Sequence, residues 1–585
     1  MKPQQAQNEK GPPSSSSTDS EGAPAGLNQG DAGAVVVGEP LDMEESSPSP
    51  DGPGPAATAR SNLRLSAILL ALCLVVFLGA LDQTIVSTAA VSITADLRDA
   101  SGYMWIGAVY LLANASASPI WAKCSDIWGR KPAILTCIAG FAGASTMAGF
   151  SRTMAMLIAA RALQGACAGG MMQLVNITIS DLFSMRRRAL YISAMGSVWI
   201  LAGTSGPLIG GALSQYASWR WCFWINPPVC AVAFVIVLLF LDVHNPRTRM
   251  RDGLLAIDWA GTVSMLAVTL LLLIGLDLGG VVYPWDSPKV ICLIVIGTLM
   301  IGVFVYSEKR LARYPLLLLS VFQGWSNVAI VVVALAHSMA SFGAEYYLPL
   351  YFQSVKQASP LQSGLYILPM IITVAILDIL SGVFMHRVGR YRELIWVGTV
   401  FLTLGTGLLI LFGPNTNLGT IIGFQVIFGF GMALPLNTVS LAIQNSVRQQ
   451  ADTATAISTL NFIRNMGTSL AAVLGGVVFQ NSMASRSPVL AASGLNQTQL
   501  DAFSGYAAAA NVELIRTIGD AGQRGTVEDA YSWSIGNMFI MYTAIAGVGM
   551  FASVLIKHRD MSKEHTETKT GIENMAKRGA GETTD

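Results

Sequence analysis

Three charged side chains lie deep inside long apolar runs of the sequence: Asp82, Arg161 and Glu345. A charge at the bilayer centre costs roughly 2.5–3.5 kcal/mol on insertion scales, so a chain that keeps one there must neutralise it, pair it or use it. Burial favours the neutral form of a carboxyl, which allows it to take up and release a proton. We therefore predict that Asp82 binds a proton, and that Glu345, at a similar depth, is a second proton-binding or cation-recognising carboxyl.

Each of these residues also has a structural interpretation. Asp82 would then be a polar side chain hydrogen-bonded inside a helix bundle, and Arg161 a static partner of a backbone carbonyl or a carboxyl. Glu345 shares one helix face with His337 and Ser341, at spacings of four and eight residues. Alternatively, Glu345 belongs to a ring of polar residues at the outer end of that helix.

The composition identifies the class of protein to which these runs belong. Of 585 residues, 52% are hydrophobic and 12% are charged, whereas soluble proteins carry about 25% charged residues. The net charge of +1 argues neither for nor against nucleic acid, but Lys and Arg lie in short clusters between apolar runs, which indicates topology and not a nucleic-acid binding patch. The seven cysteines show no CxxC spacing, and neither a phosphate-binding GxxxxGK[ST] loop nor a catalytic triad is present. We therefore expect an integral membrane protein with no enzymatic activity, cofactor or metal site.

Membrane-crossing helices need about 20 mainly apolar residues each. Fourteen runs meet this requirement, and we predict an all-α membrane protein. Asp378 and Arg464 are further charges inside them, and the sequence allows these two to pair with each other. The runs are 66–88, 103–121, 132–150, 155–179, 189–213, 220–241, 257–279, 289–307, 326–350, 361–385, 393–413, 418–441, 456–481 and 535–556.

Basic residues alternate between the loops, which predicts the orientation of the chain. The basic loops, such as those around Arg130 and Arg187, should be cytoplasmic, and an even number of spans places both termini there too. Residues 1–60 are rich in Ser, Pro and Gly and are predicted to be disordered. The long loop at 483–533 would face outside, where helical character is expected in its middle. It carries a glycosylation sequon at Asn496, whose use the sequence leaves open.

An internal repeat relates the two ends of the chain. At a shift of 260 residues, Asp126-x-x-Gly129-Arg130 aligns with His386-x-x-Gly389-Arg390. Later matches follow in the same order, which indicates two related six-helix halves with a site between them. We predict a cytoplasmic tail (1–62), a six-helix bundle (63–242), two inserted helices (255–308), a second six-helix bundle (320–557) and a cytoplasmic tail (558–585).

Several motifs resemble those of the major facilitator superfamily, in its fourteen-helix drug:proton antiporter branch of fungi. They are LDQTIVSTAAVSI (81–93), SDIWGRKPAIL (125–135), RALQGACAGG (161–170), GTSGPLIGG (203–211), WRWCFWINPP (219–228), YYLPLYFQSVKQASPLQSGLYILP (346–369) and NFIRNMGTSLA (461–471). Val91 and Ser92 replace the usual Leu-Pro, and Ala122 replaces a leading Gly. The resemblance implies the major facilitator fold and a proton-relay role for Arg161.

Two of these motifs supply candidate gating residues. Asp126, Gly129, Arg130 and Lys131 would form a cytoplasmic gate, in which Asp126 pairs with Arg130. Orientation by a basic loop is the alternative. In the second motif, Gly206 and Gly210 allow close approach and Pro207 bends the helix, and the resemblance implies that this segment shapes the interface between the halves. Packing alone explains the glycines as well.

Candidate substrate contacts are aromatic or polar residues expected near the centre of the bundle. Packing and anchoring at the membrane surface are the alternative roles of such side chains. The candidates are Trp105, Tyr110, Phe342, Tyr346 and Asn461.

The resemblance implies a proton-coupled efflux pump that exports amphipathic organic compounds such as drugs, toxins or secondary metabolites. A siderophore or amino-acid transporter on the same scaffold is the first alternative. A non-transporting sensor is the second, although the short tails leave no room for a signalling domain. We expect a monomer in the lipid bilayer, in the plasma membrane or alternatively in a vacuolar or vesicle membrane, whose partners are a small organic substrate and protons.

Overall fold

The computed structural model describes residues 55–98, 103–241, 246, 248–279, 283–311, 316–317, 319–447 and 452–561. The chain divides into two compact units, Met1–Thr58 and Ala59–Asp585, and the following description concerns the second. Of the predicted tails at 1–62 and 558–585, residues 1–54 and 562–585 lie outside the described residues, and a helix already begins at Pro55 within the first. In the described part, the only β-type pairing is one isolated bridge between Gly279 and Tyr283. The all-α prediction is confirmed.

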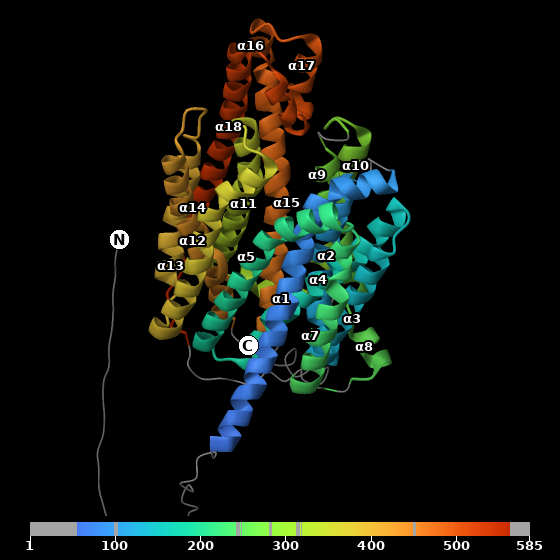
Figure 1. Ribbon diagram of the computed structural model, residues 1–585. Coiled ribbons are helices and arrows are strands. Elements are labelled where there is room, and N and C mark those ends of the chain that lie inside the picture. Colours follow the sequence, from blue (N-terminus) through green and yellow to red (C-terminus); the bar gives the residue numbers. More distant parts are fainter. Residues whose placement is uncertain are drawn as a thin grey trace, which may run out of the picture. The chain divides into compact units, whose positions relative to one another are not determined.

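A helix occupies each of the fourteen predicted spans (Figure 1). The sixth span is divided between a short helix, α6, and α7. The long helices are α1 (Pro55–Leu97), α2 (Tyr103–Trp128), α3 (Arg130–Gly149), α4 (Met154–Leu182), α5 (Met185–Tyr216), α6 (Trp221–Trp224) with α7 (Asn226–Phe240), α9 (Trp259–Leu278), α10 (Pro288–Tyr306), α11 (Trp325–Ser354), α12 (Pro360–Val388), α13 (Arg392–Leu409), α14 (Leu418–Ser446), α15 (Thr453–Ser485) and α18 (Ala521–Ser553).

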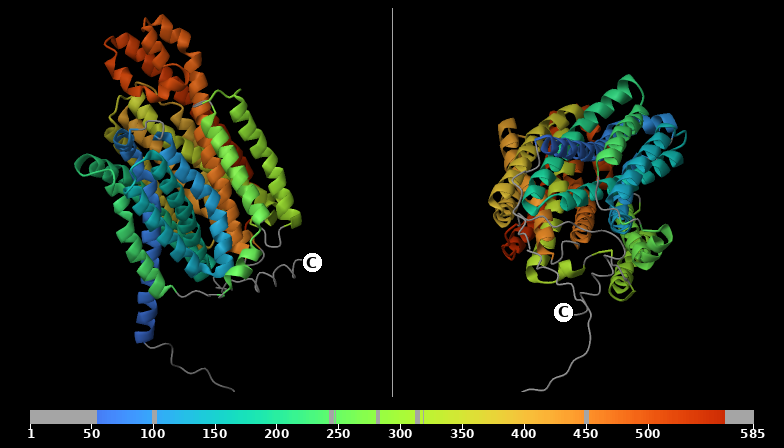
Figure 2. Two further views of the ribbon diagram at one scale, coloured as in Figure 1. Left: turned by 90° about the vertical axis from the view of Figure 1, so that its right-hand side faces the viewer. Right: turned by 90° about the horizontal axis from the view of Figure 1, so that it is seen from below.

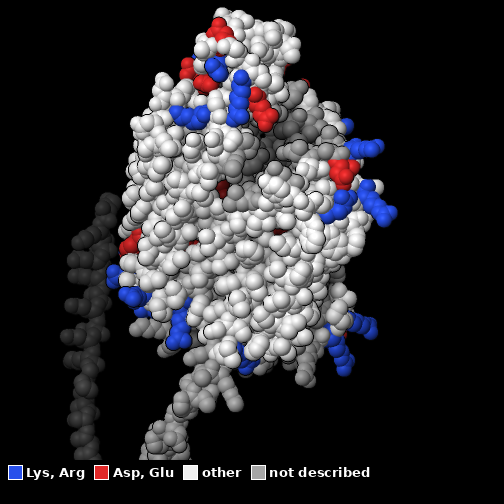
Figure 3. All heavy atoms as spheres, viewed as in Figure 1, with Lys and Arg blue, Asp and Glu red and all other residues white. Residues whose placement is uncertain are grey.

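Among the described residues, 13 helices are long and apolar enough to cross a membrane by length and composition. The remaining long helix, α2, has 26 residues, but Asn114, Ser116 and Ser118 make its middle more polar. The charged side chains in Figure 3 lie mainly near the two ends of the molecule, and the surface between them is largely uncharged. This distribution suits a chain that crosses a bilayer many times.

The helices pack as two groups with a separate pair beside them. In the first group, α4 lies against α2 and α3, and α7 lies against α3. In the second group, α11 packs against α15 and α18, while α14 packs against α12 and α13. The pair α9 and α10 contacts α2 and α15 and stands at the edge of the bundle (Figure 2). These contacts support the proposed division at 63–242, 255–308 and 320–557.

The predicted bounds of the last span are wrong. Helix α18 begins at Ala521, well before the predicted start at 535, because Asp520 caps its first turn by accepting hydrogen bonds from Gly522 N and Gln523 N. The added turns are too polar for a membrane and carry Tyr531, whose Oη donates to Ala508 O at 2.6 Å. The loop at 483–533 therefore shortens to residues 486–520.

Short helices fill that loop, as the sequence predicts for its middle. They are α16 (Ser487–Ala492), α17 (Gln497–Ala502) and two 3-10 turns, η5 (Gly505–Ala510) and η6 (Val512–Thr517). Phe503 and Ile515 are fully buried in the core of the second group. Arg516 Nη2 donates to Gln357 O at 2.8 Å, at the end of α11. The loop is thus a packed cap on the second group of helices. A further short helix, α8 (Met250–Ala256), a π-turn, η2 (Ser307–Leu311), and a 3-10 turn, η3 (Leu319–Phe322), connect the groups.

Glycines of the RALQGACAGG motif set the close packing of α4 on α2. A Cβ atom at Gly165 would overlap Tyr110 O and lie 2.8 Å from Tyr110 Cα. A Cβ atom at Gly169 would overlap Asn114 O. Since both obstacles are backbone atoms, they cannot be relieved by a change of rotamer.

We predict that Gly165→Ala destabilises the folded protein by about 1–3 kcal/mol, because overpacking forces a backbone shift. The measurement is the thermal unfolding midpoint of the purified protein in detergent. The matched control is Gly143→Ala on α3, where a Cβ atom would meet nothing within 4 Å. Equal midpoints for the two variants would contradict the packing described here.

Candidate functional site

Two deeply buried charges of the first group form an ion pair. Asp82 on α1 is 0% exposed and Arg161 on α4 is 1% exposed. Arg161 Nη1 donates to Asp82 Oδ2 at 2.5 Å. The charge of Asp82 is therefore balanced by Arg161 in this conformation.

Amide and hydroxyl groups complete the surroundings of the carboxylate. Gln164 Nε2 and Asn226 Nδ2 both donate to Asp82 Oδ1, at 3.1 and 2.8 Å. The same two amides reach Ser145 Oγ, at 2.7 and 3.3 Å. Helices α1, α3, α4 and α7 thus converge on one carboxylate. The network lies inside the first group of helices, not in a space between the two groups.

Arg161 is held on its remaining sides by α2. Its Nε donates to Ile106 O at 3.1 Å, and its guanidinium carbon lies 4.2 Å from the centre of the Tyr110 ring. Tyr110 Oη donates to Gly79 O at 3.2 Å. Because Tyr110 is only 1% exposed, it packs beneath the ion pair and does not line a substrate cleft in this conformation.

A second ion-pair cluster lies at the end of the bundle that carries Arg130 and Arg186, which we call the basic end. Arg130 Nη1 donates to Asp126 Oδ1 at 2.6 Å, and Arg130 Nε donates to Asp181 Oδ2 at 2.8 Å. The pair of Asp126 with Arg130 is the one that the sequence predicts. Asp181, at the end of α4, is the acid that sequence reasoning missed.

Gly129 and Lys131 flank this cluster. Gly129 precedes α3 with φ of 97°, a left-handed conformation that favours glycine. Lys131 is half-buried, and its side chain takes no part in the ion pairs of Arg130. The motif thus combines a turn that requires glycine with an arginine held by two carboxylates.

Helix α5 approaches α1 closely at Gly206. A Cβ atom there would overlap Thr84 Oγ1 and lie 2.9 Å from Thr84 Cβ. Gly210 is buried one turn further along. The side chain of Pro207 lies outside the described part. The crossing lies two residues from Asp82 along α1, so a movement of α5 would act directly on the helix that carries the carboxylate.

The predicted polar face of α11 divides into a buried and an exposed part. His337 is 4% exposed, and its Nε2 lies 2.8 Å from Met432 O on α14. Ser341 is 4% exposed, and its Oγ has no hydrogen-bond partner. Glu345 is exposed. The three residues share one face of α11, but only Glu345 is exposed.

Two of the candidate substrate contacts form an accessible aromatic surface beside Glu345. Phe342 and Tyr346 stack with ring centres 5.7 Å apart, and Tyr346 is 58% exposed. The side chain of Trp105 on α2 lies outside the described part. Asn461 instead joins the two groups, because its Nδ2 donates to Gln173 Oε1 on α4 at 2.7 Å.

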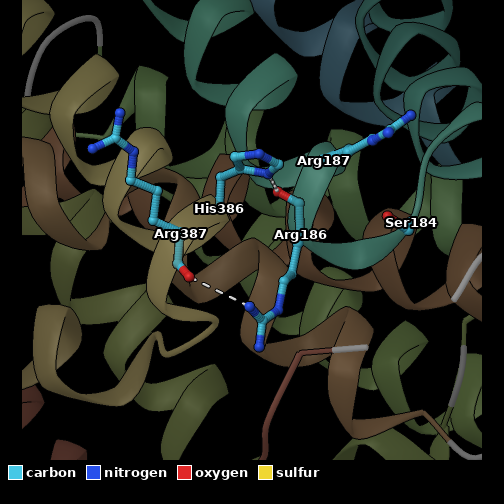
Figure 4. A pocket seen from close by; sticks show the side chains of 5 residues that line it. All are labelled: Ser184, Arg186, Arg187, His386 and Arg387. Atoms are coloured by element: carbon cyan, nitrogen blue, oxygen red, sulfur yellow. Dashed lines mark hydrogen bonds between the residues drawn. The ribbon is translucent and has the colours of Figure 1, made fainter. Parts of the chain in front are cut away.

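The groups also meet at the basic end through α5, α12 and α14. Arg188 Nη1 and Ser180 Oγ both donate to Gln444 Oε1 on α14, at 2.8 and 3.1 Å. Figure 4 shows the neighbouring junction of α5 and α12, a hollow of about 330 Å³. There, His386 Nδ1 lies 3.1 Å from Arg186 O, and Arg186 Nη1 donates to Arg387 O at 3.4 Å. Ser184 and Arg187 complete its lining.

Some residues of the site could not be singled out from the sequence, although they lie in motifs or apolar runs that the sequence shows. Asn226 lies inside the WRWCFWINPP motif, yet nothing in one sequence marks it as a partner of Asp82. Ser145 and Gln173 lie in ordinary apolar runs. In the described part of the chain, no group of three or more His, Cys, Asp or Glu residues is placed to hold a metal ion.

Asn496 of the glycosylation sequon is exposed and caps the N-terminus of α17. Its Oδ1 accepts a hydrogen bond from Gln499 N at 2.8 Å. The amide nitrogen, to which a glycan would be attached, is not part of that bond. Whether it carries a glycan stays a prediction.

The fold and the buried charges define a multi-pass membrane protein of the transporter type. A sequence model described as the Major Facilitator Superfamily matches residues 72–472. The chain is 41% identical over 560 residues to "MFS-type transporter ppz2" of Metarhizium majus, covering 95% of this chain and 94% of that one. The chain belongs to the Major Facilitator Superfamily.

Other relatives and solved structures agree with this assignment. The chain is 39% identical to "Efflux pump dotC" of Dothistroma septosporum, covering 88% of both chains. It is 33% identical to "Efflux pump FUS6" of Gibberella moniliformis, covering 80% of this chain and 83% of that one. The structure of the proton:xylose symporter XylE aligns with a TM-score of 0.53 at 13% identity, over 85% of this chain and 97% of that one, and shows the shared fold.

We predict that Arg130→Ala destabilises the protein by about 3–5 kcal/mol, because it leaves Asp126 and Asp181 as buried carboxylates without a cation. The measurement is thermal unfolding of the purified protein. The control is Arg187→Ala, which removes an exposed arginine at the same end. If Arg130→Ala unfolds at the wild-type temperature, the cluster does not hold α2, α3 and α4 together.

Proposed function

We propose that the chain is a proton-coupled efflux transporter for amphipathic organic compounds. The observation that carries this proposal is the ion pair of Asp82 and Arg161. Replacing a buried ion pair by apolar side chains is often neutral or stabilising, so such a pair is weak support for a purely structural role. Ionisable residues within membrane spans mark ion and substrate pathways.

The names of the relatives support the direction of transport. Those of Dothistroma septosporum and Gibberella moniliformis are named efflux pumps. Export of toxins or secondary metabolites is therefore the proposed role. The membrane potential would supply about 2.3 kcal/mol per charge per 100 mV to a process that moves protons inward.

Proton coupling requires that Asp82 exchange one partner for another. In the described conformation Arg161 neutralises it, while Gln164 and Asn226 donate to its second oxygen. We propose that a proton replaces Arg161 as the neutralising partner in another conformation. Glu345, exposed on α11 beside Tyr346, is the second proposed proton-binding group.

Alternating access would follow from contacts between the groups at the basic end. The described hydrogen bonds between the groups lie there or toward it. They are Gln173–Asn461, Ser180 and Arg188 with Gln444, Ser197–Ala375, and Arg186 with His386, Arg387 and Met561. This arrangement corresponds to a conformation that is closed at the basic end. Proposed gating residues are Asp126, Gly129, Arg130, Lys131, Gly206, Pro207 and Gly210.

The proposed substrate surface consists of Phe342 and Tyr346, with Trp105 and Asn461 as further candidates. Stacked aromatic rings suit bulky apolar compounds. Tyr110 would contact substrate only after the ion pair rearranges. We further propose a monomer in the plasma membrane, with both termini in the cytoplasm and a glycan on Asn496.

The test of proton coupling is efflux of a fluorescent amphipathic dye, ethidium, from yeast cells that lack their own drug pumps. We predict that cells expressing the chain extrude the dye, and that a proton uncoupler abolishes the difference from control cells. If extrusion by the chain persists unchanged with the uncoupler, the transport is not driven by protons.

The test of the residue assignment is Asp82→Asn in the same assay. We predict at least a tenfold loss of uncoupler-sensitive efflux, because the amide retains hydrogen-bonding capacity but takes up no proton. The matched control is Asp252→Asn, which removes an exposed carboxylate on α8. Full transport by Asp82→Asn across pH would remove Asp82 from the mechanism.

A further inference from the structure

The two groups of helices make a close contact between α5 and α12 in the basic half of the bundle. Ser197 Oγ donates to Ala375 O at 3.3 Å. A Cβ atom at Gly382 would lie 2.6 Å from Ser193 Cβ. We call this contact the α5–α12 seam, and it comprises Arg186, Ser193, Gly196 and Ser197 on α5 with Ala375, Asp378, Gly382 and His386 on α12.

A carboxyl group occupies the middle of the seam. Asp378 on α12 is 0% exposed. A Cβ atom at Gly196 on α5 would overlap Asp378 Oδ2 and lie 2.8 Å from Asn437 Nδ2. The absence of a side chain at Gly196 therefore makes room for the carboxyl of the opposite group. Opening the seam would expose Asp378 to water from the basic end.

The partners of this carboxyl are neutral. Asn437 Nδ2 on α14 donates to Asp378 Oδ1 at 3.0 Å and to Oδ2 at 3.1 Å. Ser193 Oγ lies beside the carboxyl. A hydroxyl at this place can donate a hydrogen bond to the carboxylate or accept one from the neutral acid.

The charged group that faces Asp378 is Arg464 on α15. Arg464 Nη2 donates to Leu436 O, and its Nε has no partner. Among the described residues, no ion pair joins Asp378 to Arg464, so the pairing that the sequence allowed is not formed. Asp378 and Asp82 are equally buried, but only Asp82 has a guanidinium in contact.

A carboxylate held by one amide is costly to bury, whereas the neutral acid is not. We propose that Asp378 is a proton-binding site between the two groups, and that its protonation holds the α5–α12 seam closed. The proton resides on a carboxyl oxygen of Asp378 and is donated to Ser193 Oγ. When the seam opens, the proton passes to water at the basic end and leaves the carboxylate solvated. The role of this proton release in transport rests on the proposed function. The existence of a proton-binding site at Asp378 does not depend on it.

The direction of the pH effect follows from linkage. The closed seam binds the proton more tightly than the open seam, so the closed form carries more protons. Acid therefore favours closure, and closure is lost as the pH rises through the range in which Asp378 titrates. His386 is a second titratable group in the seam, in contact with Arg186 O, and must be tested separately.

The experiment measures the distance between spin labels at the basic ends of α5 and α12. Labels are placed at Arg187→Cys and Val388→Cys, both exposed positions, in a full-length chain whose seven cysteines have been replaced. The protein is reconstituted without substrate in neutral phosphatidylcholine nanodiscs. One bound proton changes the ratio of open to closed seams by up to about tenfold per pH unit. We expect the fraction of open seams to rise several-fold between about pH 5.5 and about pH 8.5.

Two variants show which residue causes the pH response of the seam. Asp378→Asn should keep the seam closed at every pH, because the amide stays neutral, while His386→Gln should retain the pH response. A wild-type seam that does not respond to pH, or a response that survives in Asp378→Asn, would overturn the proposal. Because no substrate is present, failure of proton-driven efflux does not affect this readout, and the two proposals can fail separately.

A third variant covers the case in which Asp378→Asn does not fold. Asn437→Leu removes the amide that stabilises the charged carboxylate, and it leaves Asp378 in place. We expect the pH of half-opening to rise by about one unit or more, because the charged form loses its hydrogen bonds. An unchanged or lower pH of half-opening would contradict the assignment of the proton to Asp378.

Discussion

The ion pair between Asp82 and Arg161 is the constraint around which the first group of helices is built. A charge in the middle of a membrane protein must be neutralised, and here one carboxylate and one guanidinium do this at 2.5 Å. Arg161 also binds α2 through Ile106 O, and Asp82 binds α7 through Asn226, which in turn donates to Ser145 on α3. The glycines of α4 are needed for the same reason, because only a close approach of α2 brings Tyr110 under the guanidinium.

The second group of helices treats its buried carboxyl differently. Asp378 lies in the seam between the groups and has an amide and a hydroxyl beside it, with Arg464 turned to a backbone carbonyl. One carboxyl is thus neutralised within a group of helices, and the other lies where the groups must separate. An ion pair within one group of helices resists movement of those helices. A carboxyl in the α5–α12 seam instead makes closure of the seam depend on whether that carboxyl is charged. The two groups of helices therefore differ in how they neutralise a buried carboxyl.

Much of the fold could be predicted from the sequence because membrane crossing imposes a strong local requirement. The fourteen apolar runs correspond to helices, and the early start of α18 was missed because its polar turns lie beyond the apolar run and are fixed by tertiary contacts of Tyr531. Pairing between distant residues was harder. Asp126 and Arg130 are one turn apart, so their pair was predictable, whereas Asp181, Asn226 and Ser145 reach their partners only through packing. The surroundings of single side chains could not be predicted from the sequence either. Tyr110 and Asn461 were candidate substrate contacts, but Tyr110 is buried under the ion pair and Asn461 binds Gln173.

We propose that substrate transport is coupled to protons because the conformations of the protein differ in the charge of buried carboxyls. The most direct measurement is the release of protons from the purified, weakly buffered transporter when an exported dye binds. The account predicts that dye binding releases protons from the wild type and that Asp82→Asn releases fewer. Dye binding that releases no protons, or an equal release by Asp82→Asn, would contradict it.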